Sequence, residues 1–170
     1  MNKAVIISIQ PKWCELIASG KKTVEVRKTK PKLETPFKCY IYQTKMKWAY
    51  TLLRTLRLHK LADARVMWLG KVIGEFVCNK ISEIGYSPER HGTYVSDIEN
   101  LHVKSCVNFE EMFDYIADGY GYGWHISDLV IYDKPKELGE FHKPTLPTGL
   151  CYEDDAITKP PQSWCYVEEV

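Results

Sequence analysis

Residues 20–27 read Gly-Lys-Lys-Thr-Val-Glu-Val-Arg, and a short helical run precedes them. A glycine turn leads into a strand on which Thr23, Glu25 and Arg27 recur at every second position, so these side chains face one way and the valines between them face a core. A hydroxyl, a carboxylate and a cation on a rigid strand suit a small polar group such as a nucleobase or a phosphate. The same alternation is also typical of an ordinary half-exposed strand.

The length of 170 residues predicts one domain spanning residues 1–170, and 45% hydrophobic residues are enough for a proper core. No apolar run is long enough to span a bilayer. The early apolar run, residues 4–7, is too short for the core of a signal peptide. We therefore expect a cytoplasmic protein without a membrane partner.

The cysteine pattern argues against a metal site. No C-x-x-C pair occurs among the six cysteines, and the nearest approach to a ligand pair, His102 with Cys106, has no second pair of comparable spacing. Phosphate-binding glycine motifs are also absent. We expect no metal and no cofactor, and we expect the cysteines to be reduced and mostly buried.

The net charge of +1 conceals a strong asymmetry along the chain. Residues 1–71 contain 16 Lys and Arg against 4 Asp and Glu, whereas the remaining residues contain 7 against 18. A basic half with interleaved aromatic residues favours a surface that attracts phosphates. The alternative is that the two halves neutralise each other across the fold.

Hydrophobic periodicity and turn residues give a coarse order of elements. Residues 86–104 are expected to be irregular and residues 119–123 to form a turn. Strands are expected over residues 4–9, 23–28, 37–44, 70–84, 124–132 and 163–168, and helices over residues 11–19 and 109–117.

Residues 46–66 contain no glycine or proline and mix leucines with cations, which predicts a basic amphipathic helix. Its cations Arg54, Arg57 and Lys60 would form a basic surface. This surface could contact nucleic acid or an acidic protein partner of unknown identity, or could simply be solvated. A helix on a membrane surface is a less favoured option, because the rest of the sequence is typical of a closed soluble domain.

Few helices, about six strands and no βαβ repeat predict an α+β fold. We expect a small mixed or antiparallel β-barrel with flanking helices.

The pattern helix-Gly-Lys-Lys-Thr-x-Glu-x-Arg within residues 7–27 resembles the signature of the ASCH domain, a member of the PUA-like superfamily. Residues 70–78, 124–129 and 161–167 are also similar to compact ASCH proteins of bacteria and their phages. Residues 46–69 and 86–107 look like insertions. The resemblance implies a PUA-like β-barrel whose cleft binds RNA or a modified nucleobase.

The resemblance also implies site residues. Lys22 and Glu25 fall on motif positions that line the family's cleft, and Arg27 falls on the motif's arginine. Some relatives resemble hydrolases of N4-acetylcytidine that use a lysine, a threonine and a glutamate. Here Lys22 matches the lysine, but Glu25 stands at the threonine position, and Thr23 is out of step by two.

We therefore predict a nucleic-acid-binding protein whose ligand is RNA, a nucleotide or a nucleoside. In the alternative, a small hydrolase of modified nucleosides or of RNA, Lys22 and Glu25 would be catalytic. Arg27 would pair with Glu25 and orient it, and a tryptophan could stack on a base unless it lies in the core. The predicted ligand-binding residues are Lys12, Lys22, Thr23, Glu25, Arg27, Trp124, His125, Ser163 and Trp164.

Overall fold

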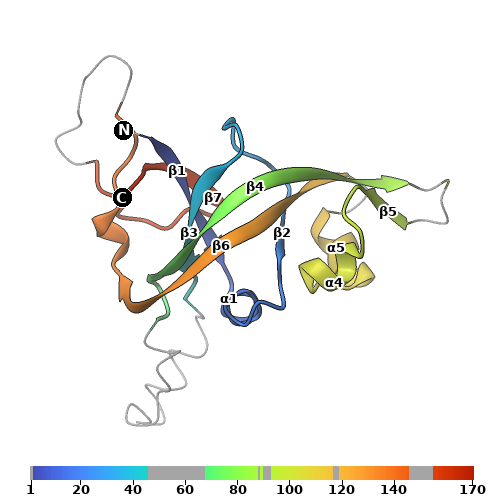
Figure 1. The fold of residues 1–170 in the computed structure, drawn as a ribbon, viewed down its shortest axis with the longest axis horizontal. Coiled ribbons are helices and arrows are strands. Elements are labelled where there is room, and N and C mark those ends of the chain that lie inside the picture. Colours follow the sequence, from blue (N-terminus) through green and yellow to red (C-terminus); the bar gives the residue numbers. More distant parts are fainter. Residues whose placement is uncertain (1, 46–67, 88, 90–92, 117–118, 146–154) are drawn as a thin grey trace, which may run out of the picture. The chain divides into compact units, whose positions relative to one another are not determined.

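The computed structural model describes residues 2–45, 68–87, 89, 93–116, 119–145 and 155–170. Figure 1 shows the elements in these parts of the chain. In order, they are β1 (Lys3–Ile9), α1 (Pro11–Ala18), β2 (Val24–Arg27), β3 (Phe37–Gln43), β4 (Val72–Ser87), β5 (Thr93–Ser96), α4 (Leu101–Ser105), α5 (Phe109–Ile116), β6 (Tyr120–Lys136), the 3₁₀ helix η2 (Leu138–Glu140) and β7 (Trp164–Glu168).

The strands are hydrogen-bonded in the order β2-β6-β4-β3-β1-β7, and β5 pairs with β4 beside this path. β1 and β3 are parallel, whereas β1 with β7, β2 with β6 and β4 with β5 are antiparallel. The prediction of an α+β fold on a mixed sheet is confirmed. Within the described residues the strand order ends at β2 and β7, so the sheet is open and the word barrel is approximate.

The described residues form two compact units. The first unit consists of Met1–Glu15, Lys38–Phe76 and Val130–Val170, and the second consists of Leu16–Phe37 and Val77–Leu129. The long strands β4 and β6, green and orange in Figure 1, each contribute residues to both units.

The first unit is built around β1, which has β3 on one side and β7 on the other. Six consecutive residues of β1, Ala-Val-Ile-Ile-Ser-Ile, are buried. A strand covered on both faces requires an apolar run rather than alternation, and this sequence provides one. The core around it contains Ala4, Ile6, Tyr40, Tyr42, Val72, Phe141, Ile157 and Val167.

The second unit contains β2, β5, α4 and α5. Helix α5 begins after Asn108, whose side-chain oxygen accepts the Glu111 N–H at 2.8 Å while the Glu111 carboxylate accepts the Asn108 N–H at 3.4 Å. This capping box sets the start of the helix, which the sequence predicted at residue 109. The core of the unit contains Val24, Val26, Ile84, Ile98, Leu101, Met112 and Ile116.

All six predicted strands and the two predicted helices that fall on described residues are present, with ends shifted by a few residues. The prediction of an irregular segment over residues 86–104 is wrong, because this segment holds the end of β4, all of β5 and most of α4. Helix α4 has only five residues, and Asn100 before it makes no side-chain capping bond. The usual local signals of a helix start are therefore missing from the sequence.

The turn predicted over residues 119–123 is also wrong, because β6 begins at Tyr120. Gly121 and Gly123 follow the two-residue period of a strand and leave space for the core. A Cβ atom at Gly121 would lie 2.5 Å from Ile116 Cδ1, and one at Gly123 would lie 2.4 Å from Ile98 Cδ1. Close packing, rather than a turn, requires these glycines.

The basic helix predicted over residues 46–66, with Arg54, Arg57 and Lys60, lies outside the described residues. The single domain with two insertions stays a prediction. None of the described helices combines the length and the apolar composition needed to cross a membrane. The five described cysteines are free, and Cys14, Cys39 and Cys78 are buried.

Gly74 on β4 allows a close backbone approach, which is a common role of a glycine inside a strand. A Cβ atom there would lie 2.4 Å from the Val130 carbonyl oxygen, and backbone cannot rotate away as a side chain can. We expect Gly74→Ala to lower the free energy of unfolding by about 1–3 kcal/mol in urea denaturation. Gly139→Ala, where no atom lies within 4 Å, is the control and should change it by less than about 0.5 kcal/mol. Equal effects of the two substitutions would contradict the steric argument.

Candidate functional site

Three charged side chains meet at β2, and we call Lys22, Glu25 and Arg27 the triad. Lys22 Nζ lies 3.2 Å from Glu25 Oε2, and Arg27 Nη2 lies 2.9 Å from Glu25 Oε1. All three residues are buried, with exposed fractions of 2%, 5% and 7%. The prediction that Arg27 pairs with Glu25 is confirmed, whereas the alternative of a half-exposed strand is wrong, because all four residues of β2 are buried.

The segment before β2 fixes the position of Lys22. Gly20 has a φ of 72°, a conformation that glycine adopts without strain, and it ends the helical run. Lys22 Nζ then donates to the Ser105 carbonyl oxygen at 2.5 Å, and the Thr23 N–H donates to the Lys104 carbonyl oxygen at 2.8 Å. The end of α4 therefore provides acceptors to the chain entering β2.

Removing a carboxylate from water costs several kcal/mol unless it is paired and hydrogen-bonded. Glu25 meets this condition because each of its oxygens contacts a cation. Lys22 acts in this arrangement as a donor to a carboxylate and to a carbonyl oxygen. The triad is thus a buried, mutually paired group of three formal charges with a sum of +1.

The strand register divides the predicted ligand-binding residues between two faces. Glu25 lies opposite Trp124 on β6, and Val24 lies opposite His125. Directly opposite residues of an antiparallel pair share a face, and neighbours along a strand do not. Trp124 is therefore on the face of Glu25, and His125 is on the other face.

Trp124 is fully buried, and its ring packs edge-on against the ring of Phe37 with centroids 5.8 Å apart. Its packing is that of a core residue. Base stacking on Trp124 would require the surrounding side chains to move.

A second polar group, absent from the sequence predictions apart from His125, lies on the other face. Ser82 Oγ is 2.9 Å from His125 Nε2, and Lys80 Nζ is 2.6 Å from Asp97 Oδ2. Hydrogen bonds from Lys80 and from Ser82 hold the pKa of Asp97 below its usual value. We call Lys80, Ser82, Asp97 and His125 the histidine network.

Burial lowers the pKa of His125, and the positive charges of Lys80 and Lys104 lower it further, against the opposing effect of Asp97. His125 is therefore neutral at pH 7.

The histidine network joins β4, the residues after β5, and β6, which are far apart in the sequence. The sequence offers one signal for the position of Ser82. It lies two residues from Ile84, a core residue, so the two side chains are expected on the same face of β4.

The remaining predicted residues are exposed or partly exposed. Thr23 is exposed beside Lys22. Lys12 is exposed, and its Nζ lies 4.2 Å from the centroid of the Trp13 ring. Ser163 and Trp164 are partly exposed and, like Lys12, belong to the first unit.

The first unit holds a further polar group around Glu75 on β4. The Tyr132 hydroxyl donates to the Glu75 carboxylate, and Lys38 Nζ lies 3.3 Å from it. Burial and the Glu75 carboxylate raise the pKa of Tyr132, which stays a neutral donor. Glu75 thus belongs to the first unit, whereas the triad belongs to the second.

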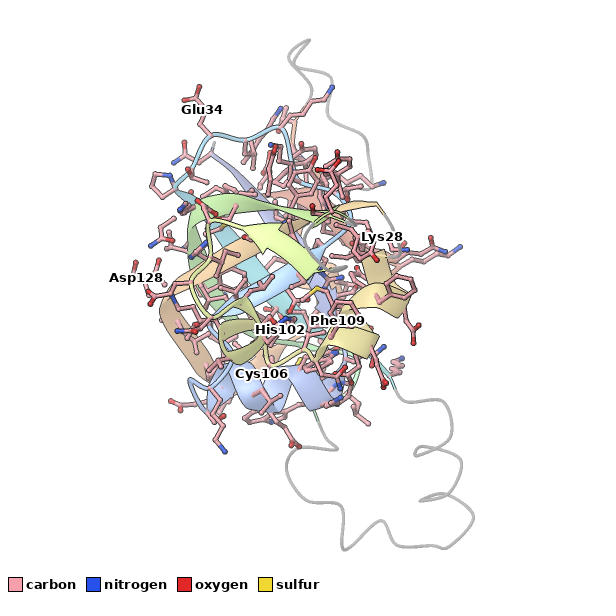
Figure 2. The ribbon with its side chains drawn as sticks, turned by 90° about the vertical axis from the view of Figure 1, so that its right-hand side faces the viewer. Lys28, Glu34, His102, Cys106, Phe109 and Asp128 are labelled. Atoms are coloured by element: carbon pink, nitrogen blue, oxygen red, sulfur yellow. The ribbon has the colours of Figure 1, made fainter. Side chains whose placement is uncertain are left out.

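Figure 2 labels His102 on α4, Phe109 at the start of α5 and Lys28, the first residue after β2. Lys28 Nζ lies 5.3 Å from the centroid of the Tyr115 ring on α5.

Among the described residues, no three His, Cys, Asp or Glu side chains are grouped so that they could hold a metal ion.

Comparison with known proteins agrees with this architecture. Three crystal structures of the ASCH protein from Zymomonas mobilis match the fold. The first has a TM-score of 0.60 at 18% identity and covers 98% of this chain and 88% of that one. A serine-to-alanine mutant of the same protein has a TM-score of 0.59 at 18% identity and covers 98% of this chain and 89% of that one. A tyrosine-to-phenylalanine mutant has a TM-score of 0.57 at 19% identity and covers 99% of this chain and 92% of that one.

This likeness defines the fold class, an α+β protein built on a mixed sheet. Residues 7–117, more than half of the chain, match the model of the ASCH domain. The chain belongs to the ASCH domain family. No curated protein matches it.

Breaking a buried ion pair leaves a charge without compensation, which costs about 3–5 kcal/mol. We expect Glu25→Gln to lower the free energy of unfolding by this amount in urea denaturation. Glu83, which lies 3.3 Å from Lys30 Nζ and has a side chain 73% exposed, provides the matched control. Glu83→Gln should change stability by less than about 1 kcal/mol. A loss for Glu25→Gln no larger than for Glu83→Gln would show that the triad is not a buried charge network.

The lowered pKa of His125 makes stability depend on pH. An unfolded histidine, with a pKa of about 6.5, binds a proton more readily than folded His125, so the free energy of unfolding falls as pH drops through this value. We expect His125→Gln to make this fall shallower than in the wild type, measured by urea denaturation between about pH 7 and pH 5. His102→Gln, an exposed control, should leave the fall unchanged. If the free energy of unfolding of His125→Gln fell with pH as steeply as that of the wild type, the lowered pKa of His125 would be contradicted.

Proposed function

We propose that the chain recognises single-stranded RNA or a modified nucleobase, with the triad as the recognition group. The observation that carries the proposal is the Glu25 carboxylate held between two cations in a site with little solvent. A carboxylate accepts from the amino group of a base, and a cation donates to a base carbonyl or a phosphate oxygen. Both kinds of contact are stronger where water is scarce.

The face of the triad continues toward exposed cations. Tyr122 lies directly opposite Arg27 and shares its face, and Lys30 Nζ lies 4.9 Å from the centroid of the Tyr122 ring. Lys28 lies over Tyr115 in the same way. Exposed lysines beside aromatic rings are typical of surfaces that follow the backbone of single-stranded nucleic acid. Membership of the ASCH family supports the same ligand class.

The contacts of Lys22 argue against the hydrolase alternative. A lysine that acts as a base or nucleophile needs a free lone pair. Lys22 instead donates to Glu25 and to the Ser105 carbonyl oxygen. This geometry supports recognition rather than catalysis by Lys22.

Binding of a labelled single-stranded RNA, followed by fluorescence anisotropy across a series of salt concentrations, tests the proposal. Each phosphate contact contributes about 0.7 to the slope of log K against log salt. We expect the double variant Lys28→Gln/Lys30→Gln to bind more weakly and to lose about 0.7 of slope for each contact removed. Lys134→Gln, a charge-matched exposed control in the first unit, should behave as the wild type.

Two results would overturn the proposal. One is a failure of the wild type to bind RNA even at low salt. The other is release of product from N-acylated cytidines by the wild type but not by Glu25→Gln, at temperatures where circular dichroism shows the variant folded. The second result would make the chain a hydrolase.

A further inference from the structure

Helix α5 exposes two phenylalanine rings that belong neither to the triad nor to the histidine network. Phe109 and Phe113 are each 42% exposed, although phenylalanine is among the residues most often buried. Their rings lie nearly parallel with centroids 6.3 Å apart, and Tyr86 of β4 meets Phe113 edge-on at 5.9 Å. The three rings thus form a continuous series within the second unit, and we call Tyr86, Phe109 and Phe113 the aromatic ridge.

The core of the unit does not account for these two phenylalanines. Met112 and Ile116, one turn apart on α5, are buried and supply the apolar stripe by which the helix packs on the core. Phe109 and Phe113 are also one turn apart, but Phe113 lies about 100° around the helix from Met112. A helix with a single buried face carries polar residues outside its stripe. A second, exposed apolar pair therefore indicates an interaction surface.

A row of carboxylates runs beside the two rings. Glu110 and Asp114 each follow one of the phenylalanines, so they are likewise one turn apart, and both are exposed. Every charged residue of α5 is a carboxylate, with Glu111 as the third. A molecule that covers the rings therefore lies next to negative charge.

This charge argues against nucleic acid on the aromatic ridge. Single-stranded RNA uses aromatic rings that lie in a positively charged groove, because its phosphates follow its bases. Lys28 provides such a cation at Tyr115, but Tyr115 lies about 200° around α5 from Phe113. Carboxylates beside the aromatic ridge repel phosphates instead. The chemistry of the ridge suits an occupant that is apolar opposite the rings and positive opposite the carboxylates.

We propose that the aromatic ridge, together with Glu110 and Asp114, docks a basic amphipathic helix of a protein partner. Rows of side chains four residues apart pack between one another where two helices meet, so a partner helix matches the one-turn spacing on α5. Its apolar side chains cover Phe109 and Phe113, and its lysines or arginines face the two carboxylates. The surface adds a protein partner to the proposed function and does not depend on it.

A designed peptide tests this surface on the intact chain. The probe is a helix of about 18 leucine and lysine residues with the leucines on one face. One control peptide has the same composition in scrambled order, and the other has glutamate in place of lysine. We expect the probe to shift the nuclear magnetic resonance signals of the Phe109 and Phe113 rings in a saturable way, and we expect neither control peptide to do so.

A variant without the two rings tests their contribution to affinity. We expect Phe109→Ala/Phe113→Ala to bind the probe at least about tenfold more weakly, because the apolar surface that the probe covers is lost. Tyr120→Ala is the control, since it removes a ring of the same unit that is 78% exposed. It should bind the probe as the wild type does.

A second variant tests the charges without removing any apolar contact. We expect Glu110→Gln/Asp114→Asn, checked for folding by circular dichroism, to bind the probe more weakly and with a smaller dependence on salt. The charge-matched control, Glu34→Gln/Asp133→Asn, changes two exposed carboxylates outside α5. It should bind as the wild type does.

Three results would overturn the inference. One is binding of the scrambled or the glutamate peptide as tightly as the probe. Another is binding of the probe that Glu110→Gln/Asp114→Asn does not weaken. The third is a different occupant: single-stranded RNA that shifts the ring signals of Phe109 and Phe113, or self-association in analytical ultracentrifugation that Phe109→Ala/Phe113→Ala abolishes.

Discussion

The pairing of the Glu25 carboxylate with two cations is the interaction on which the second unit depends. A carboxylate on a buried strand is tolerated only if its charge is matched, and Lys22 and Arg27 match it from either side. Lys22 can do so because its backbone is placed by the Gly20 turn and its ammonium also binds the end of α4. The bond from Lys22 therefore connects the chain entering β2 to α4, and β2 is a strand at which the hydrogen-bonded order of the described sheet ends.

The sequence predicted the elements whose signals are local. β1 has a continuous apolar run, α5 has an asparagine cap, and the Gly-Lys-Lys-Thr-x-Glu-x-Arg pattern marks β2. It did not predict α4, because this short helix is held by acceptors that it offers to Lys22 and Thr23 rather than by a cap of its own. The role of Gly121 and Gly123 at the start of β6 was not predicted, because it depends on how the side chains of Ile116 and Ile98 pack against them.

The candidate site was predicted only where its signals are local in the sequence. The pairing of Glu25 with Arg27 follows from a two-residue spacing, and the structure contains it. The burial of the triad could not be predicted, since it depends on what covers β2. Trp124 and His125 were grouped because they are neighbours in sequence, yet neighbours on a strand face opposite ways. The partners of His125 come from β4 and from the residues after β5, which no local pattern connects.

The two faces of the β2–β6 pair differ in how their polar groups are held. On one face, the charges of the triad pair with one another. On the other face, burial and the positive charges of Lys80 and Lys104 lower the pKa of His125, so this ring is not held by an ion pair. Under the proposed function, a ligand would meet the charges of the triad already oriented by their pairing, so less free energy would be lost in ordering them.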